Sequence, residues 1–194
     1  MNKFVYNAPT EWTPKEHFPD LSKEKLIAID LETCDTQLTT HGSGWATNNG
    51  YVTGIAVATA NWEGYYPIAH NGGNLDKTKV LDWFKTVAKL DCPKIFHNAS
   101  YDIGWLKSLG ITVNGKVHDT MISSALLDEN RYSYTLNSLA KDKLGRTKNE
   151  DLLIAAAKEF GVDPKKEMYK LPSMHVGEYA EYDARLTYDL YLLN

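Results

Sequence analysis

The chain has 194 residues, a formal net charge of −4, and 43% hydrophobic and 24% charged residues. This length and composition suit one ordinary globular domain with a substantial core. The negative charge argues against a protein that binds duplex DNA on a large basic surface. It still allows an enzyme that holds a few nucleotides through metal cations.

Membrane and export signals are not apparent in the sequence. Its apolar stretches are strand-sized, whereas roughly 20 apolar residues are needed to cross a bilayer. Residues 1–6 lack the apolar region of a signal peptide. Cys34 and Cys92 show no metal-ligand spacing, and two free thiols are favoured over one disulfide. We therefore expect a cytoplasmic protein that has no membrane partner.

The first half of the chain predicts an arm, three strands and a loop. Residues 1–24 are polar and contain three prolines, which predicts an irregular arm with at most one short helical turn, before a folded domain over 25–194. Apolar runs predict strands over 26–31, 52–59 and 65–68, and the last two form a hairpin. Residues 35–50 are rich in glycine and asparagine, so they predict a loop.

The rest of the chain predicts helices that alternate with short strands. Helical spacing covers 75–90, a strand follows over 94–97, and the next helix runs from an Asn98 N-cap to about residue 109. A strand near 117 precedes a helix over 119–127, capped by Asp119, and helices over 135–144, 149–160 and 175–193 complete the chain. This order predicts an α/β domain, with a mixed sheet flanked by helices and an antiparallel second strand.

Carboxylates gather near the ends of two predicted strands. Asp30 and Glu32 lie two residues apart on the first strand, so their side chains point to the same face. They would repel each other unless a divalent cation such as Mg²⁺ or Mn²⁺ lies between them. Asp102 follows the fourth strand, and parallel neighbouring strands would bring it to the same edge as Asp30.

A tyrosine and a further aspartate share a face of the last predicted helix. Tyr179 and Asp183 lie four residues apart, so the phenol can orient a water beside a metal-binding carboxylate. Taken alone, each of these motifs has a simpler interpretation as a solvated turn, an N-cap with a surface acid, or an amphipathic pair. In this order they indicate carboxylates that gather divalent cations to hydrolyse a phosphodiester.

These motifs resemble a known family. The sequence from about residue 25 to 193 is similar to the DEDD superfamily of 3′–5′ exonucleases, in the subgroup whose last motif is Tyr-x-x-x-Asp. It most resembles the proofreading domain of family A (polymerase I-like) DNA polymerases of phage type. Flanking segments that carry the resemblance are residues 54–58, 66–70, 118–121, 136–140 and 176–184. The resemblance implies a ribonuclease H-like fold.

The resemblance also implies roles for the site residues in a two-metal mechanism. Asp30, Glu32 and Asp183 would hold the first of two Mg²⁺ or Mn²⁺ ions. Asp30 would bridge to the second, together with Asp102. Tyr179 would position the attacking water, and two further residues would touch the terminal nucleotides, namely Thr33 and Asn98. The product would be a nucleoside 5′-monophosphate released from a single-stranded or frayed DNA 3′ end. A DNA polymerase domain in cis or in trans is the implied partner, in the host cytoplasm if the protein is phage-encoded.

Several alternatives remain open at this stage. An RNA-trimming exonuclease would use the same residues, and a catalytically silent nucleic-acid-binding module is a third interpretation. Thr36 stands where the family often has a bulky residue that wedges between bases, which leaves Leu38 or Trp45 for that contact. The basic stretch of residues 141–148 faces either DNA, a partner or solvent. His70, His97 and His118 are assigned structural roles, whereas His175 lies one turn before Tyr179 and is a weaker candidate than that tyrosine.

Overall fold

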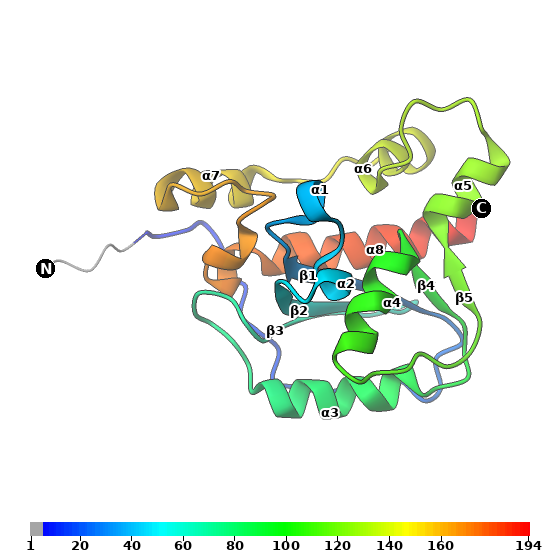
Figure 1. The fold of residues 1–194 in the computed structure, drawn as a ribbon, viewed down its shortest axis with the longest axis horizontal. Coiled ribbons are helices and arrows are strands. Elements are labelled where there is room, and N and C mark those ends of the chain that lie inside the picture. Colours follow the sequence, from blue (N-terminus) through cyan, green and yellow to red (C-terminus); the bar gives the residue numbers. More distant parts are fainter. Residues whose placement is uncertain (1–5) are drawn as a thin grey trace, which may run out of the picture.

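The structure is a computed structural model that describes residues 6–194. Its centre is one mixed sheet (Figure 1). The strands lie in the order β3-β2-β1-β4-β5. Their bounds are β1 Ile27–Cys34, β2 Tyr51–Ala58, β3 Glu63–Pro67, β4 Lys94–Phe96 and β5 Val117–Asp119. β2 runs antiparallel to β1 and β3, whereas β4 runs parallel to β1 and β5. The predicted α/β fold, with its antiparallel second strand, is confirmed.

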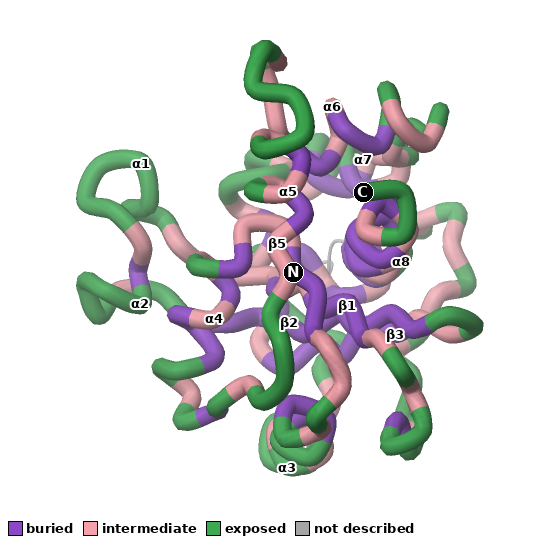
Figure 2. The backbone as a smooth tube through the Cα atoms, turned by 90° about the vertical axis from the view of Figure 1, so that its right-hand side faces the viewer, coloured by how far each residue is buried: buried purple, intermediate pink, exposed green. Residues whose placement is uncertain are grey.

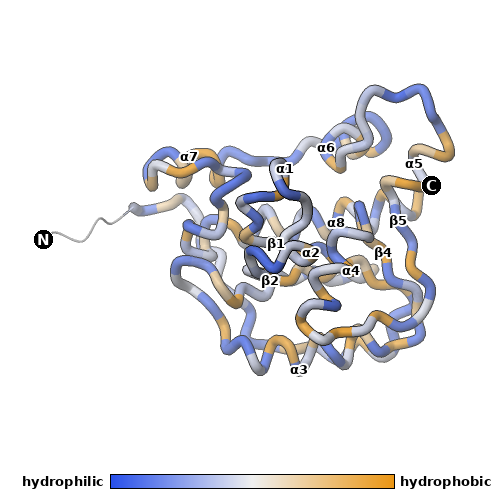
Figure 3. Tube along the Cα trace, viewed as in Figure 1, coloured by the Kyte–Doolittle hydropathy of each residue, from blue (hydrophilic) through white to orange (hydrophobic). Residues whose placement is uncertain are grey.

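Helices cover both faces of this sheet. Successive side chains of β1 point to opposite faces, so each face contributes to a separate core. Ile27, Ile29 and Leu31 belong to the core beneath α3 (Lys77–Ala88) and α4 (Ala99–Ser108). Ala28 belongs to the core beneath α7 (Asp151–Phe160) and α8 (Gly177–Leu193). Figure 2 shows the buried strands between α3 and α8. In Figure 3 apolar residues recur along α3 among hydrophilic ones, as expected for a helix with one buried face.

The predicted loop over 35–50 holds two short helices, α1 (Leu38–His41) and α2 (Gly44–Thr47). Four-residue helices are not stable by themselves, so local sequence did not predict them. Contacts distant in sequence stabilise α2. The Asp35 carboxylate accepts a hydrogen bond from the Gly44 amide at 3.0 Å. The Trp45 ring packs so closely on α4 that a Cβ added at Gly104 would lie 2.2 Å from it.

Of the remaining helices, those over 120–144 and 151–160 lie near their predicted positions, whereas two short 3₁₀ helices were not predicted. The helices not yet named are α5 (Thr120–Leu127), α6 (Leu136–Leu139), which continues as a π-helix over Ala140–Leu144, and 3₁₀ helices over Met168–Lys170 and Ser173–His175. α8 begins at Gly177, two residues later than predicted. A Cβ added there would lie 2.1 Å from the Trp12 ring, so this position has no room for a side chain.

The N-terminal arm packs against the domain in the part that the structure describes. Residues 6–24 contain no helix, and residues 1–5 of the predicted arm lie outside the described residues. Trp12 donates a hydrogen bond from its indole to Glu181 at 3.1 Å, and Phe18 stacks on Tyr66 with ring centroids 5.5 Å apart. Cys34 and Cys92 are free thiols. No helix within residues 6–194 is long and apolar enough to cross a membrane.

Candidate active site

Asp30 and Glu32 lie on the face of β1 that is covered by α8. They alternate with the isoleucine and leucine side chains that face α3, as the two-residue period of a strand requires. Small residues let α8 approach this face closely, since Ala28, Ala180 and Ala184 are fully buried between the helix and the sheet. The first turns of α8 therefore carry Asp183 directly over the two carboxylates of β1.

Three carboxylates meet at this point. Oxygen atoms of Asp30, Glu32 and Asp183 all lie within 4.8 Å of one another. Asp183 is buried and its Oδ1 atom has no hydrogen-bond partner, while Asp30 and Glu32 are half-buried. A buried carboxylate oxygen without a partner, next to two further carboxylates, is the donor set that a hard divalent cation prefers. The residues present thus fit a Mg²⁺ or Mn²⁺ ion.

Asp102 approaches the same edge from another element. It lies in the first turn of α4, which follows β4 directly, and it is buried. Burial raises the pKa of its carboxyl, and the charges of Asp30 and Glu32 raise it further, while a hydrogen bond from the Leu31 backbone opposes them. The structure thus places the predicted fourth carboxylate beside the cluster of three, within reach of its electric field.

The cluster is strained electrostatically when no cation is bound. Burial raises the pKa of Asp30 to about 7, with a further contribution from the Asp183 charge. Burial also raises the pKa of Glu32 well above its usual range, followed by the charges of Asp30 and Asp183. Carboxyls with these shifts resist full ionisation at neutral pH. A divalent cation would reverse the local sign of the potential and let all of them ionise.

Lys148 is a member of the site that the sequence did not single out. Its Nζ atom lies 2.6 Å from Asp183 Oδ2 and 3.3 Å from the Tyr179 hydroxyl. The side chain is only 9% exposed, although the residue lies in an irregular segment between the π-helix and α7. In the sequence Lys148 is one of several basic residues over 141–148, and nothing local marks it as buried while Lys141 is exposed.

Tyr179 lies one helical turn before Asp183, as predicted. Burial raises the pKa of its hydroxyl far above the usual value, and the charges of Asp183 and Glu32 add to this effect. The phenol is therefore neutral at ordinary pH and cannot serve as a base. Its oxygen can donate and accept hydrogen bonds, which suits a group that orients water.

A shallow groove of about 170 Å³ opens next to the carboxylates, along the end of β1. It is lined by Thr33, Leu38, Tyr101, Lys165 and their neighbours. The register between β1 and β2 shifts between Glu32 and Thr33, and such a bulge re-aims the side chains that follow it. Leu38 and Trp45 are 41% and 37% exposed, but only Leu38 lines this groove, because one face of the Trp45 ring packs on α4. This geometry favours Leu38 over Trp45 as the apolar contact for a base.

Asn98 occupies the N-cap position of α4, but its side chain makes no capping hydrogen bond, so this part of the prediction was wrong. Its backbone is left-handed, with φ of 68°, a conformation that asparagine tolerates. The Asp119 carboxylate accepts hydrogen bonds from the backbone amides of Asn98 and Ala99 at 3.1 and 2.8 Å. It also caps α5 as predicted. Asn98 is left half-exposed at the edge of the sheet where Asp102 lies.

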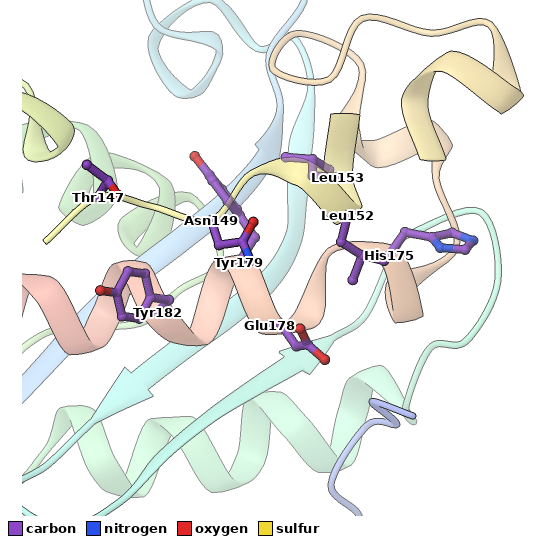
Figure 4. Close-up of a pocket in the computed structure, with 8 residues that line it drawn as sticks. All are labelled: Thr147, Asn149, Leu152, Leu153, His175, Glu178, Tyr179 and Tyr182. Carbon is purple, nitrogen blue, oxygen red and sulfur yellow. The ribbon is translucent and has the colours of Figure 1, made fainter. Parts of the chain in front are cut away.

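A cavity of about 280 Å³ lies on the other side of Tyr179. Figure 4 shows its lining side chains, which come from α7, from α8, from the segment before α7 and from the 3₁₀ helix Ser173–His175. His175 lines this cavity, and its ring lies 5.5 Å from Tyr6 and 5.6 Å from Phe160 between centroids. His175 therefore lies in an aromatic cluster.

The three histidines with predicted structural roles make contacts of that kind. His70 pairs with the buried Tyr65 hydroxyl at 2.5 Å. His97 pairs with the Thr120 hydroxyl at 2.8 Å, and His118 packs on Tyr191 with ring centroids 4.9 Å apart.

The sheet order, with helices on both faces and carboxylates at the ends of the central strands, defines an α/β protein with a ribonuclease H-like exonuclease fold. The RNase D of Trypanosoma brucei has this fold. It aligns with a TM-score of 0.64 and 19% identity, over 89% of this chain and 58% of that one. NrnC of Brucella melitensis, in a structure with bound Mg²⁺, aligns with a TM-score of 0.56 and 16% identity, over 93% of this chain and 78% of that one.

The chain belongs to the 3′–5′ exonuclease family that is found in family A DNA polymerases, and residues 7–192 match that family. It is 38% identical over 180 residues to a DNA-directed DNA polymerase of Pseudomonas phage M6. That match covers 87% of this chain and 27% of the phage polymerase. The chain therefore spans about a quarter of the length of the polymerases that it matches.

Proposed function

We propose that the protein is a metal-dependent 3′–5′ exodeoxyribonuclease of the Tyr-x-x-x-Asp subgroup, which releases nucleoside 5′-monophosphates from DNA 3′ ends. The observation that carries this proposal is the meeting of Asp30, Glu32 and Asp183 within 4.8 Å, with Tyr179 one turn away. Membership of the 3′–5′ exonuclease family indicates the reaction, and the carboxylate oxygens are the ligands that hard divalent cations prefer.

Two Mg²⁺ or Mn²⁺ ions would supply positive charge to both the attacking and the leaving oxygen of the phosphodiester. Asp30, Glu32 and Asp183 would hold one ion. Asp30 would extend to the second with Asp102, which lies on the neighbouring element. That a related fold is known with bound Mg²⁺ supports this assignment. The water oxygen would attack phosphorus while the bond from phosphorus to the 3′ oxygen breaks.

The chain's own side chains would orient the reactants. Tyr179 is a neutral phenol at the edge of the cluster, so it would hold the water by hydrogen bonds while a carboxylate accepts the proton. Thr33 and Asn98 lie beside the carboxylates on β1 and at the start of α4, where they would bind the terminal nucleotide. The groove between Thr33 and Leu38 would receive the preceding part of a single strand.

The similarity to phage DNA polymerases favours DNA over RNA, and it favours a proofreading role beside a polymerase domain in cis or in trans. The protein would then act on single-stranded or frayed ends, because the scissile phosphate must reach carboxylates that are at least half-buried. On this proposal the folded nuclease unit is residues 25–194, and residues 1–24 form its arm.

The test is cleavage of a 5′-labelled single-stranded DNA oligonucleotide with Mg²⁺, with an RNA oligonucleotide of the same sequence in parallel. We expect a ladder that shortens from the 3′ end and a nucleoside 5′-monophosphate as the product. Asp183→Ala should lower the rate at least about 10³-fold, and Tyr179→Phe should lower it less, since other contacts also orient the water.

Asp82→Ala is the matched control, because Asp82 is an exposed aspartate on α3. Its rate should equal that of the unmodified protein. Faster trimming of RNA than of DNA would reject the proofreading role and support an RNA-trimming enzyme. If the 3′ end stayed intact with Mg²⁺ and also with Mn²⁺, the protein would not be a nuclease, and the interpretation as a binding module would remain.

A further inference from the structure

Lys148 presents a buried positive charge to the carboxylates, and the proposed mechanism does not use it. Its ammonium donates to Asp183 Oδ2 at 2.6 Å, and it lies 4.8 Å from the centroid of the Tyr179 ring. The side-chain exposure of the pair is 9% for the lysine and 8% for the aspartate. Ion pairs buried to this degree interact far more strongly than exposed ones, because water screens them less.

The charge of Lys148 acts on the whole cluster. Its ammonium contacts Asp183, whose carboxylate oxygens lie within 4.8 Å of those of Asp30 and Glu32. One lysine therefore partly neutralises the three carboxylates that would otherwise face one another without a cation. A divalent ion held by the same oxygens would be repelled by this ammonium and would compete with it for Asp183.

The backbone around Lys148 permits such a competition. The residue lies in an irregular segment that follows the π-helix Ala140–Leu144 and precedes α7, so no helical or ladder hydrogen bonds fix its position. Its long aliphatic stem can move the ammonium by several ångströms without moving α8. The side-chain contacts of Lys148, and not a regular element of the backbone, therefore hold its ammonium at the cluster.

We propose that Lys148 is a built-in counter-ion of the acid cluster, which holds Asp183 in the metal-free protein and sets how tightly the site binds divalent metal. This inference rests on the proposed metal site. A lysine that competes with the metal weakens metal binding and stabilises the metal-free fold. Both effects raise the metal concentration at which the site is half-filled.

The test compares the unmodified protein with Lys148→Met, which keeps a stem of similar length and removes the charge. Mn²⁺ binding is measured by calorimetry, and melting is followed with chelator and with saturating Mn²⁺. We expect Lys148→Met to bind Mn²⁺ about tenfold more tightly, as removal of one nearby like charge implies. It should also melt at a lower temperature in chelator, so that Mn²⁺ raises its Tm by more than that of the unmodified protein.

Lys141→Met is the matched control, because Lys141 is exposed in the same basic stretch and its loss changes the net charge equally. It should leave Mn²⁺ affinity unchanged. Lys148→Arg keeps the charge and should bind Mn²⁺ as weakly as the unmodified protein does, which tests the idea even if the methionine variant folds poorly. In cleavage assays, the Mg²⁺ concentration that gives half-maximal rate should fall in Lys148→Met.

The outcomes separate this inference from the proposed function. If Lys148→Met loses equal stability with and without Mn²⁺ and keeps its affinity, Lys148 only tethers its segment and the inference is wrong. Weaker Mn²⁺ binding in Lys148→Met would show that the lysine supports the metal site, which also overturns it. If the unmodified protein binds no Mn²⁺, the metal site itself fails, and the counter-ion role fails with it.

Discussion

Replacing Asp30 with asparagine is expected to stabilise the metal-free protein at neutral pH, at the expense of activity. The pKa of Asp30 rises from 3.8 to about 7 in the folded protein, chiefly because burial disfavours its charge and then because Asp183 lies beside it. The folded protein therefore binds this proton more tightly than the unfolded chain. The free energy of unfolding falls as pH rises between these two values.

The size of the effect follows from the two pKa values. The difference between 3.8 and about 7 corresponds to about 4 kcal/mol when Asp30 is fully ionised. Glu32 and Asp183 share this penalty, and they ionise more readily once residue 30 is neutral. We therefore expect Asp30→Asn to gain about 2 to 4 kcal/mol at pH 8 in chelator, or about 5 to 15 °C in Tm for a domain of this size.

The assay is urea denaturation from pH 4 to pH 8.5 in chelator, with Asp82→Asn as the exposed control. The gain of Asp30→Asn should be near zero at pH 4, grow up to about pH 7 and then level off. Saturating Mn²⁺ should stabilise the unmodified protein much more than the variant. A variant no more stable than the unmodified protein at pH 8, or a gain that does not depend on pH, would refute the reasoning.

Two further predictions concern groups that hold the framework of the site. Lys94 is fully buried, and its ammonium donates to three backbone carbonyls, those of Leu90, Cys92 and Asn114. Lys94→Met leaves these acceptors unpaired and should cost about 2 to 4 kcal/mol in urea denaturation; an unchanged midpoint would show that water replaces the lysine. Asp119→Ala removes the acceptor for the first amides of both α4 and α5, so it should cost about 2 to 3 kcal/mol and also slow cleavage, because Asp102 lies on α4. Loss of stability with full activity would show that Asp102 does not depend on this cap.

Much of the fold could be predicted from the sequence, because its signals are local. The apolar run at the first strand and the amphipathic pattern over 75–90 depend on neighbours within a few residues, and both elements appear at the expected positions. Asp30 and Glu32 share a face because a strand has a period of two. Tyr179 and Asp183 share a face because a helix repeats every 3.6 residues.

Other features of the site depend on contacts between distant parts of the chain. Asn98 has the residue type of an N-cap, yet Asp119, 21 positions later, accepts the hydrogen bond from its amide. The short helix α2 forms where the sequence predicts a loop, because Asp35 and α4 hold it in place. Short-range patterns contain no information about partners at this distance.

The sequence by itself determined the order of elements, the mixed sheet and the faces on which the acids lie, since all of these follow from the periodicity of the backbone. The tertiary structure decided which charge neutralises those acids. Lys148 and Asp183 are separated by 35 positions and join only because the segment before α7 crosses the start of α8. The electrostatic potential at the site is the sum of contributions from groups that are distant in sequence and close in space. It therefore depends on the folded structure and could not be predicted from local sequence patterns.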